Sequence, residues 1–284
     1  MMVNSDLLLR SEIRRKPRVC AVSYLNTAPL VWGAVNGPQK GLLDLTFAVP
    51  SICADRVVEG DADIGLVPAI EMARHGLEMI PIGIACRGPV RSILLISDRP
   101  FEEIRTLAVD SGSRTSVQLA RVILARKFGV SPTILTMDPD LVGMLELADA
   151  ALIIGDAALA LDPAEIDMPC LDLGEEWVEM TGLPFVFAAW SGRKENLKPE
   201  LTELLKASCL YGLGQLDTII KEEADRRGFS EDLVHQYLTR NICFLLGDEE
   251  AAGLALYLEY VRELDGAPAA VTETGIHDQT TGSR

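Results

Sequence analysis

The sequence predicts an α/β protein of two lobes with a central cleft between them. Short apolar runs alternate with helical segments, a pattern typical of sheets covered by helices. The alternation occurs in two successive blocks, and a helical region without strands follows them. The chain has 284 residues, and at about 150 residues per domain this length suits two units.

The first block begins at Arg18. Its apolar runs are rich in β-branched residues, while Gly60 and Gly76 supply helix ends. Because helices separate most of the strands, we expect a parallel sheet. The predicted strands are 18–23, 44–49, 63–68, 79–86 and 91–97, and the predicted helices are 52–60 and 69–76.

The second block begins at the apolar run 106–110. A long helix over 114–128 follows, with Val117, Leu124 and Phe128 largely on one side and Gly129 at its end. The other predicted strands are 133–137, 151–155, 169–173 and 184–190, and a helix is predicted around 141–147. The region 197–264 is predicted to be all helical.

These blocks define the expected domains. Lobe one comprises 18–103 and 187–264, and lobe two comprises 104–186, so the chain crosses between lobes near 97–105 and near 183–191. The cleft should lie where the carboxyl ends of both sets of strands face each other, as ligand sites do in open α/β sheets. Both ends of the chain, 1–17 and 265–284, lack the apolar content to fold and are predicted to be tails.

Composition excludes several classes of function. The formal net charge is −16, which leaves no broad basic surface for nucleic acid. No apolar run reaches the roughly 18 residues of a membrane span, and no signal-peptide core is present near the N-terminus. We therefore expect a cytoplasmic protein that binds neither nucleic acid nor membrane.

The six cysteines do not suggest a metal site or a disulfide framework. They are more than thirty residues apart, with no CxxC motif and no nearby histidine. The three histidines, His75, His235 and His277, do not flank predicted strand ends, which argues against a Ser-His-Asp triad.

Four motifs lie at or within predicted strands and could present polar groups to the cleft. SYLNTAP offers Ser23, Asn26 and Thr27, although these residue types also form turns that satisfy only their own backbone. GPVRSILL places Ser92 within an apolar strand, where a hydrogen-bonding role is expected because no histidine is near.

The segment DSGSRTS, residues 110–116, joins a strand to the start of a long helix. Free amides and the helix dipole make such a start a site for an anion. A capped helix without a ligand is the alternative. GDAAL, with Gly155 and Asp156, repeats the arrangement, and there Asp156 is interpreted as an N-cap or a hydroxyl acceptor rather than a base.

Taken in order, six blocks resemble the chorismate dehydratase family of the futalosine route of menaquinone biosynthesis. They are SYLNTAPL, VPS with GDADIGLVPAIE, GPVRSILLIS, DSGSRTSVQLA, IIGDAAL and DLGEEWVEMTGLPFVFAAW. The resemblance implies a two-lobed, periplasmic-binding-protein type II-like fold used as an enzyme without metal or organic cofactor. It also implies the reaction, in which chorismate, a small dicarboxylate, loses water to give 3-[(1-carboxyvinyl)oxy]benzoate.

The resemblance also suggests roles. Asn26 and Ser92, from the SYLNT and VRS blocks, are expected near the reacting carbons as catalytic residues. No histidine lies in the matching blocks, so the enolpyruvyl carboxylate of the substrate is the candidate base. The assembly is left open, with a homodimer as one alternative. The expected substrate-binding residues are Ser23, Tyr24, Thr27, Ser113, Arg114, Thr115, Ser116, Gly155 and Asp156.

Other functions stay open on the sequence alone. A related enzyme, 1,4-dihydroxy-6-naphthoate synthase, shares the implied fold, but its pattern has a TTA-type helix start and a histidine in the second lobe. No histidine occurs here between residues 76 and 234. A non-catalytic binding protein for a small carboxylate is the other alternative, either a transport receptor or the effector domain of a regulator.

Overall fold

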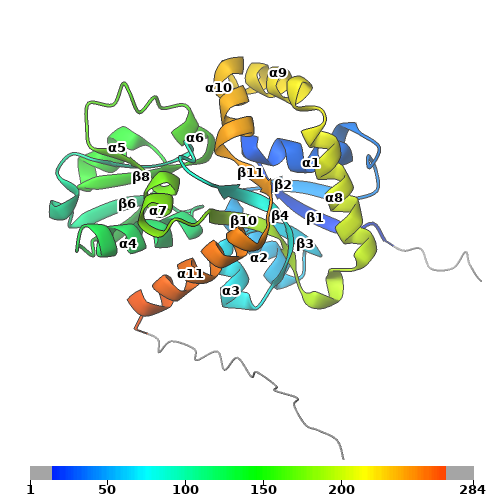
Figure 1. Cartoon of the computed structure of the whole chain (residues 1–284), viewed down its shortest axis with the longest axis horizontal. Helices are drawn as coiled ribbons and strands as arrows, with labels where there is room; N and C mark the ends of the chain where they lie inside the picture. The colour runs from blue at the N-terminus through cyan, green and yellow to red at the C-terminus, as the bar shows by residue number, and fades with distance from the viewer. Residues whose placement is uncertain (1–14, 267–284) are drawn as a thin grey trace, which may run out of the picture.

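The computed structural model describes residues 15–266 and contains two separate sheets, each covered by helices (Figure 1). The predicted tails therefore lie outside the described residues, apart from 15–17 and 265–266. The two α/β lobes expected from the sequence are confirmed. Within residues 15–266, every helix is too short or too polar to cross a bilayer.

The first sheet has the strand order β11-β4-β10-β3-β1-β2. Its strands are β1 (Arg18–Val22), β2 (Asp44–Ala48), β3 (Ile64–Pro68), β4 (Glu78–Cys86), β10 (Phe185–Gly192) and β11 (Cys243–Leu245). The second sheet has the order β7-β6-β8-β5-β9. Its strands are β5 (Ile93–Ser97), β6 (Thr106–Asp110), β7 (Thr133–Met137), β8 (Ala150–Ile154) and β9 (Cys170–Asp172).

The helices cover the faces of the two sheets. They are α1 (Ala28–Asn36), α2 (Pro50–Glu59), α3 (Ala69–His75), α4 (Thr115–Lys127), α5 (Leu141–Leu147), α6 (Gly155–Leu159), α7 (Leu173–Thr181), α8 (Pro199–Leu213), α9 (Leu216–Arg227), α10 (Glu231–Gln236) and α11 (Asp248–Leu264). Short 3-10 turns lie at η1 (Leu25–Thr27), η2 (Phe101–Glu103) and η3 (Lys194–Asn196), and a π-helical turn, η4, spans Tyr237–Asn241.

Both sheets are mixed, so the expectation of a parallel sheet is wrong for β5 and β10. β5 pairs antiparallel with β8, and β10 pairs antiparallel with β3 and β4. These are the two strands that receive the chain as it passes between lobes. Each enters its sheet from the cleft side and so runs against the neighbours whose carboxyl ends point there. Their amino ends consequently line the cleft.

The crossings lie earlier than the sequence indicated. Ile93–Ser97 belongs to the second sheet, so the chain leaves the first lobe between Cys86 and Ile93 rather than near 97–105. The return is complete before Phe185. β4 and β5 are consecutive apolar runs, and apolarity alone does not tell which sheet each strand joins.

Several elements were not predicted. Helix α1 begins directly after SYLNT, with Pro29 in its first turn, where a missing N–H costs nothing. Helix α7 follows β9, capped by the Asp172 side chain, which accepts from Gly174 N and Glu175 N. The three-residue strand β11 interrupts the region predicted to be all helical.

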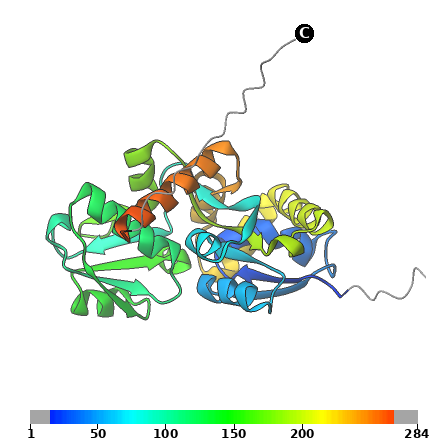
Figure 2. The same ribbon diagram turned by 90° about the horizontal axis from the view of Figure 1, so that it is seen from below.

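The last helix joins the two lobes. α11 packs against β10 of the first sheet and against α4 of the second lobe, and Figure 2 shows it lying across both. Trp177 and Phe185 form edge-to-face contacts with Tyr257 of this helix. One apolar core therefore continues from lobe to lobe beside the cleft.

Candidate active site

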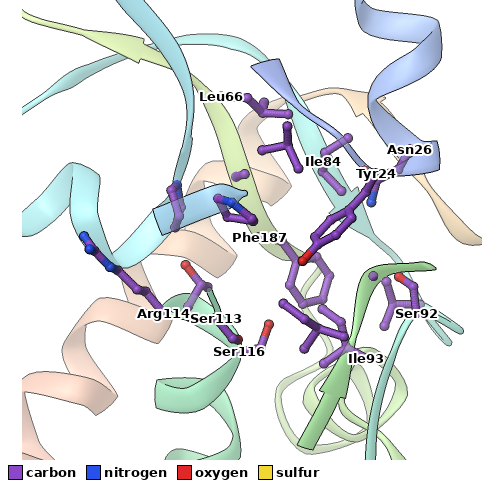
Figure 3. A pocket seen from close by; sticks show the side chains of 18 residues that line it. Tyr24, Asn26, Leu66, Ile84, Ser92, Ile93, Ser113, Arg114, Ser116 and Phe187 are labelled. Carbon is purple, nitrogen blue, oxygen red and sulfur yellow. The ribbon is translucent and has the colours of Figure 1, made fainter. Parts of the chain in front are cut away.

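A cavity lies where the strand ends of the two lobes meet, the place where ligands bind in open α/β sheets. The first lobe contributes the ends of β1, β3 and β4, and the second contributes the end of β8 and the start of α4. Figure 3 shows these side chains converging. Its lining residues are Val22, Tyr24, Asn26, Pro50, Leu66, Pro68, Ile84, Val90, Ser92, Ile93, Ser113, Arg114, Thr115, Ser116, Ile154, Gly155, Phe187 and Ala188.

The SYLNT block turns sharply after β1. Residues Leu25–Thr27 form a 3-10 turn, which spreads successive side chains around its axis. Tyr24 and Asn26 consequently line the cavity. Ser23 and Thr27, predicted to bind substrate, do not: both face a groove on the other side of Tyr24.

Gly155 closes the cavity from the opposite lobe. A Cβ on Gly155 would come within 2.8 Å of the Tyr24 ring, so the ring lies directly against the glycine backbone. The Gly155 N–H is not free for a ligand, because it donates to the Ser92 carbonyl at 2.8 Å. The Gly155 amide therefore takes no part in the second anion site predicted at GDAAL, although Gly155 itself lines the cavity.

Asp156 joins the lobes instead of lining the cavity. Its Oδ1 accepts from the Leu25 amide at 2.9 Å, and its Oδ2 accepts from the Arg227 guanidinium. Asp156 was predicted to bind substrate, but it does not line the cavity and both of its oxygens already accept hydrogen bonds. The carboxylate is held by an arginine of α9 and by the first-lobe turn that carries Asn26.

The start of α4 presents neutral donors to the cavity. Ser113 is 7% exposed and its hydroxyl has no hydrogen-bond partner within residues 15–266. A buried hydroxyl without a partner is costly unless a ligand supplies one. Ser116 lies beside it, and the amides of the first turn of this 13-residue helix point outward with the positive end of the dipole.

Arg114 and Thr115 contact the first lobe. The Arg114 guanidinium donates to Glu71 at 3.1 Å and to Asp55 at 3.0 Å, and in Figure 3 it points away from the centre of the cavity. The Thr115 hydroxyl accepts from the Ile70 amide at 3.3 Å. Arg114 was predicted to be among the residues that bind a substrate carboxylate, but its guanidinium is already paired with two carboxylates of this chain.

Asn26 and Ser92 are joined by a residue that the sequence analysis missed. Asn26 Nδ2 donates to the Tyr237 hydroxyl at 2.9 Å, and Tyr237 donates to Ser92 Oγ at 2.8 Å. Tyr237 lies in a region that reads simply as an amphipathic helix, SEDLVHQYLTRN. No local signal places it beside residues more than 140 positions away.

The cavity is poor in ionisable groups. Among the described residues that line it, none carries a carboxylate or an imidazole. Burial, together with the charge of Asp110, raises the pKa of Tyr24 to about 12. Tyr24 therefore stays neutral near pH 7 and can donate a hydrogen bond. In the described part of the chain, no group of three or more His, Cys, Asp or Glu residues is arranged to hold a metal ion.

Comparison with known proteins gives a consistent picture. A family model described as menaquinone biosynthesis matches residues 17–263. A chorismate dehydratase of Thermus thermophilus is 29% identical over 231 residues, covering 75% of this chain and 84% of the relative. A chorismate dehydratase of Campylobacter jejuni is 29% identical over 178 residues, covering 60% and 65% respectively.

Solved structures support the fold alone. The periplasmic aliphatic sulphonate binding protein of Escherichia coli superposes with a TM-score of 0.59 at 15% identity, covering 89% of this chain and 88% of that one. The expected two-lobed, periplasmic-binding-protein type of fold is thus confirmed.

Proposed function

The chain belongs to the menaquinone biosynthesis family, and from this premise we propose that it is a carbon–oxygen lyase that dehydrates chorismate to 3-[(1-carboxyvinyl)oxy]benzoate, as the futalosine route requires. Two relatives named chorismate dehydratase support the substrate. The observation that carries the proposal is one cavity between the lobes, lined by neutral hydrogen-bond donors and, among the described residues, by no carboxylate or imidazole.

In such a cavity, hydrogen bonds from uncharged donors would bind the dicarboxylate. Ser113 and Ser116, with the first amides of α4, would hold one substrate carboxylate. The Tyr24 hydroxyl would donate from the opposite lobe. The apolar side chains of Leu66, Ile84 and Phe187 would contact the ring and exclude water from it.

The reaction is an elimination that ends in an aromatic ring. The C–H bond on the carbon bearing the enolpyruvyl ether breaks, and its electron pair becomes part of a new ring double bond. The neighbouring C–O bond then breaks, and the hydroxyl leaves. Charge that develops on the ring carboxylate is stabilised by fixed donors, in the manner of an oxyanion hole.

The proton acceptor would be the substrate itself. The described lining residues offer no carboxylate or imidazole base, and neutral Tyr24 is a donor. The enolpyruvyl carboxylate lies close to the proton that leaves, so holding the substrate in one conformation would complete the catalytic group. Asn26 and Ser92 would lie near the reacting carbons, where one of them would hydrogen-bond the departing hydroxyl.

The test uses purified chain and chorismate. We expect the diene absorbance to disappear and a product lighter by one water to form. Asn26→Ala should lower kcat by about 10²- to 10³-fold, as the loss of a positioned donor does. Asn36→Ala, at the exposed end of α1, is the matched control and should behave as wild type.

Two results would contradict the proposal. Chorismate that binds and is recovered unchanged would favour a non-catalytic binding protein, and full turnover in Asn26→Ala would remove Asn26 from the mechanism. The cytoplasmic location and the assembly state stay predictions, which cell fractionation and light scattering of the purified chain would test.

A further inference from the structure

The hydroxyl of Tyr237 is buried between two cavity residues from opposite sides of the cleft. The side chain is 1% exposed. Asn26, one partner, follows β1 of the first sheet, and Ser92, the other, immediately precedes β5 of the second. A phenylalanine would fill the same space, so packing alone does not explain a buried hydroxyl here.

The two hydrogen bonds run in one direction, from Asn26 through Tyr237 to Ser92. The Asn26 amide NH₂ donates to the Tyr237 oxygen, and Tyr237 gives its single proton to Ser92 Oγ. Ser92 Oγ is then occupied as an acceptor, and its own proton is left to point elsewhere. Since Ser92 lines the cavity, that proton is available to a ligand oxygen.

The local backbone supports the same arrangement. Tyr237 opens the π-helical turn η4, a distortion that costs helix stability and often occurs at functional sites. At the other end of this turn, Asn241 Nδ2 donates to the Pro89 carbonyl at 2.8 Å. The turn thus holds the crossing segment at Pro89 and Ser92 at once.

We propose that Tyr237 is a positioning residue that sets the Ser92 hydroxyl as a donor and the Asn26 amide in its orientation toward the substrate. The inference rests on the proposed dehydratase function. Burial raises the pKa of Tyr237 to about 12, which keeps the hydroxyl protonated at neutral pH and suits a donor rather than a base.

The experiment is a double-mutant cycle on the full chain with chorismate as substrate. Tyr237→Phe keeps the ring and should lower kcat by about 10- to 100-fold, because the reacting groups lose their orientation. The KM should change by no more than about twofold, since Tyr237 does not line the cavity. Tyr211→Phe, a half-buried tyrosine of α8, is the control and should keep the wild-type kcat.

The second arm combines Tyr237→Phe with Ser92→Ala. If Tyr237 acts through Ser92, its removal should have much less effect once the Ser92 hydroxyl is absent, so the two effects should not add. If Tyr237 has only a structural role, the decreases in kcat of the two single variants should add in the double variant. Tyr237→Phe should then also lower the melting temperature. Circular dichroism of Tyr237→Phe checks that the fold is kept.

The outcomes separate the two proposals. An active wild type with an equally active Tyr237→Phe variant overturns the positioning role, and additive effects in the cycle overturn the part of that role that acts through Ser92. Both results leave the dehydratase assignment standing. A wild type that does not convert chorismate overturns both.

Discussion

Both the backbone conformation and the close approach of Tyr24 require a glycine at position 155. Its φ is +65°, in the left-handed region, and the Tyr24 ring of the other lobe lies where a side chain would begin. Any other residue would strain the backbone and displace a cavity side chain together. Gly155 therefore allows the two lobes to come into direct contact beside the cavity.

Gly155→Ala should lower the free energy of unfolding by more than the cost of placing alanine in a left-handed backbone conformation. The backbone conformation costs about 1–2 kcal/mol for a non-glycine residue, and the clash with Tyr24 adds to it. Gly129→Ala is the control, since its φ is +70° with nothing within 4 Å. Urea unfolding measures both. Equal losses in the two variants would show that the Tyr24 contact is unimportant.

Among the elements, the start of α4 both lines the cavity and contacts the first lobe. Its free amides and Ser113 face the cavity, while Arg114 reaches α2 and α3 of the first lobe through Asp55 and Glu71. Arg114 therefore links the start of α4, which offers the donors, to helices of the first lobe. Glu71 is buried and also accepts from Arg74 at 2.8 Å.

Arg114→Gln should raise the KM for chorismate by about 3- to 10-fold with little change in kcat, because a partly exposed ion pair contributes modestly to closure. Asp55→Asn distinguishes two explanations for such an increase in KM. If Arg114 holds the lobes together, this variant raises the KM as well. If Arg114 instead attracts the substrate directly, removing Asp55 should lower the KM. Steady-state kinetics at low and high ionic strength would measure both.

The same elements show what the sequence can and cannot predict. Strands such as β1 and β6 and the helix α4 follow from apolar periodicity and turn residues, and with them the positions of Asn26 and Ser113 near strand ends. The partner of each side chain does not follow. Arg114 and Asp156 are bound by groups of the other lobe, and Tyr237 reaches Ser92 only through the tertiary fold.

For the whole molecule, buried tyrosines and buried cysteines both contribute to the response to alkaline pH. Burial raises the pKa of both Tyr24 and Tyr237 from 10.0 to about 12. As the pH rises through 10.0, the unfolded chain releases protons that the folded chain retains, so the contribution of these two tyrosines to stability falls through this range. Burial also raises the pKa of the Cys209 thiol from 9.0 to about 12, so stability begins to fall near pH 9.

We expect the urea midpoint to drop between pH 9 and pH 11, because the free energy of unfolding falls by at most about 1.4 kcal/mol per pH unit for each tyrosine above pH 10. Tyr237→Phe should show a shallower drop than wild type, because one of the retained protons is gone. A midpoint that is constant over this range, or an equal drop in the variant, would contradict the burial of these hydroxyls.

Chorismate deuterated on the ring carbon that bears the enolpyruvyl ether provides the most direct measurement of the central claim. Incubated with the purified chain, it should give an aromatic product that has lost both the deuterium and the neighbouring hydroxyl, as read by mass spectrometry. A product that retains the deuterium, or substrate recovered intact, would contradict an elimination carried out in the cavity between the lobes.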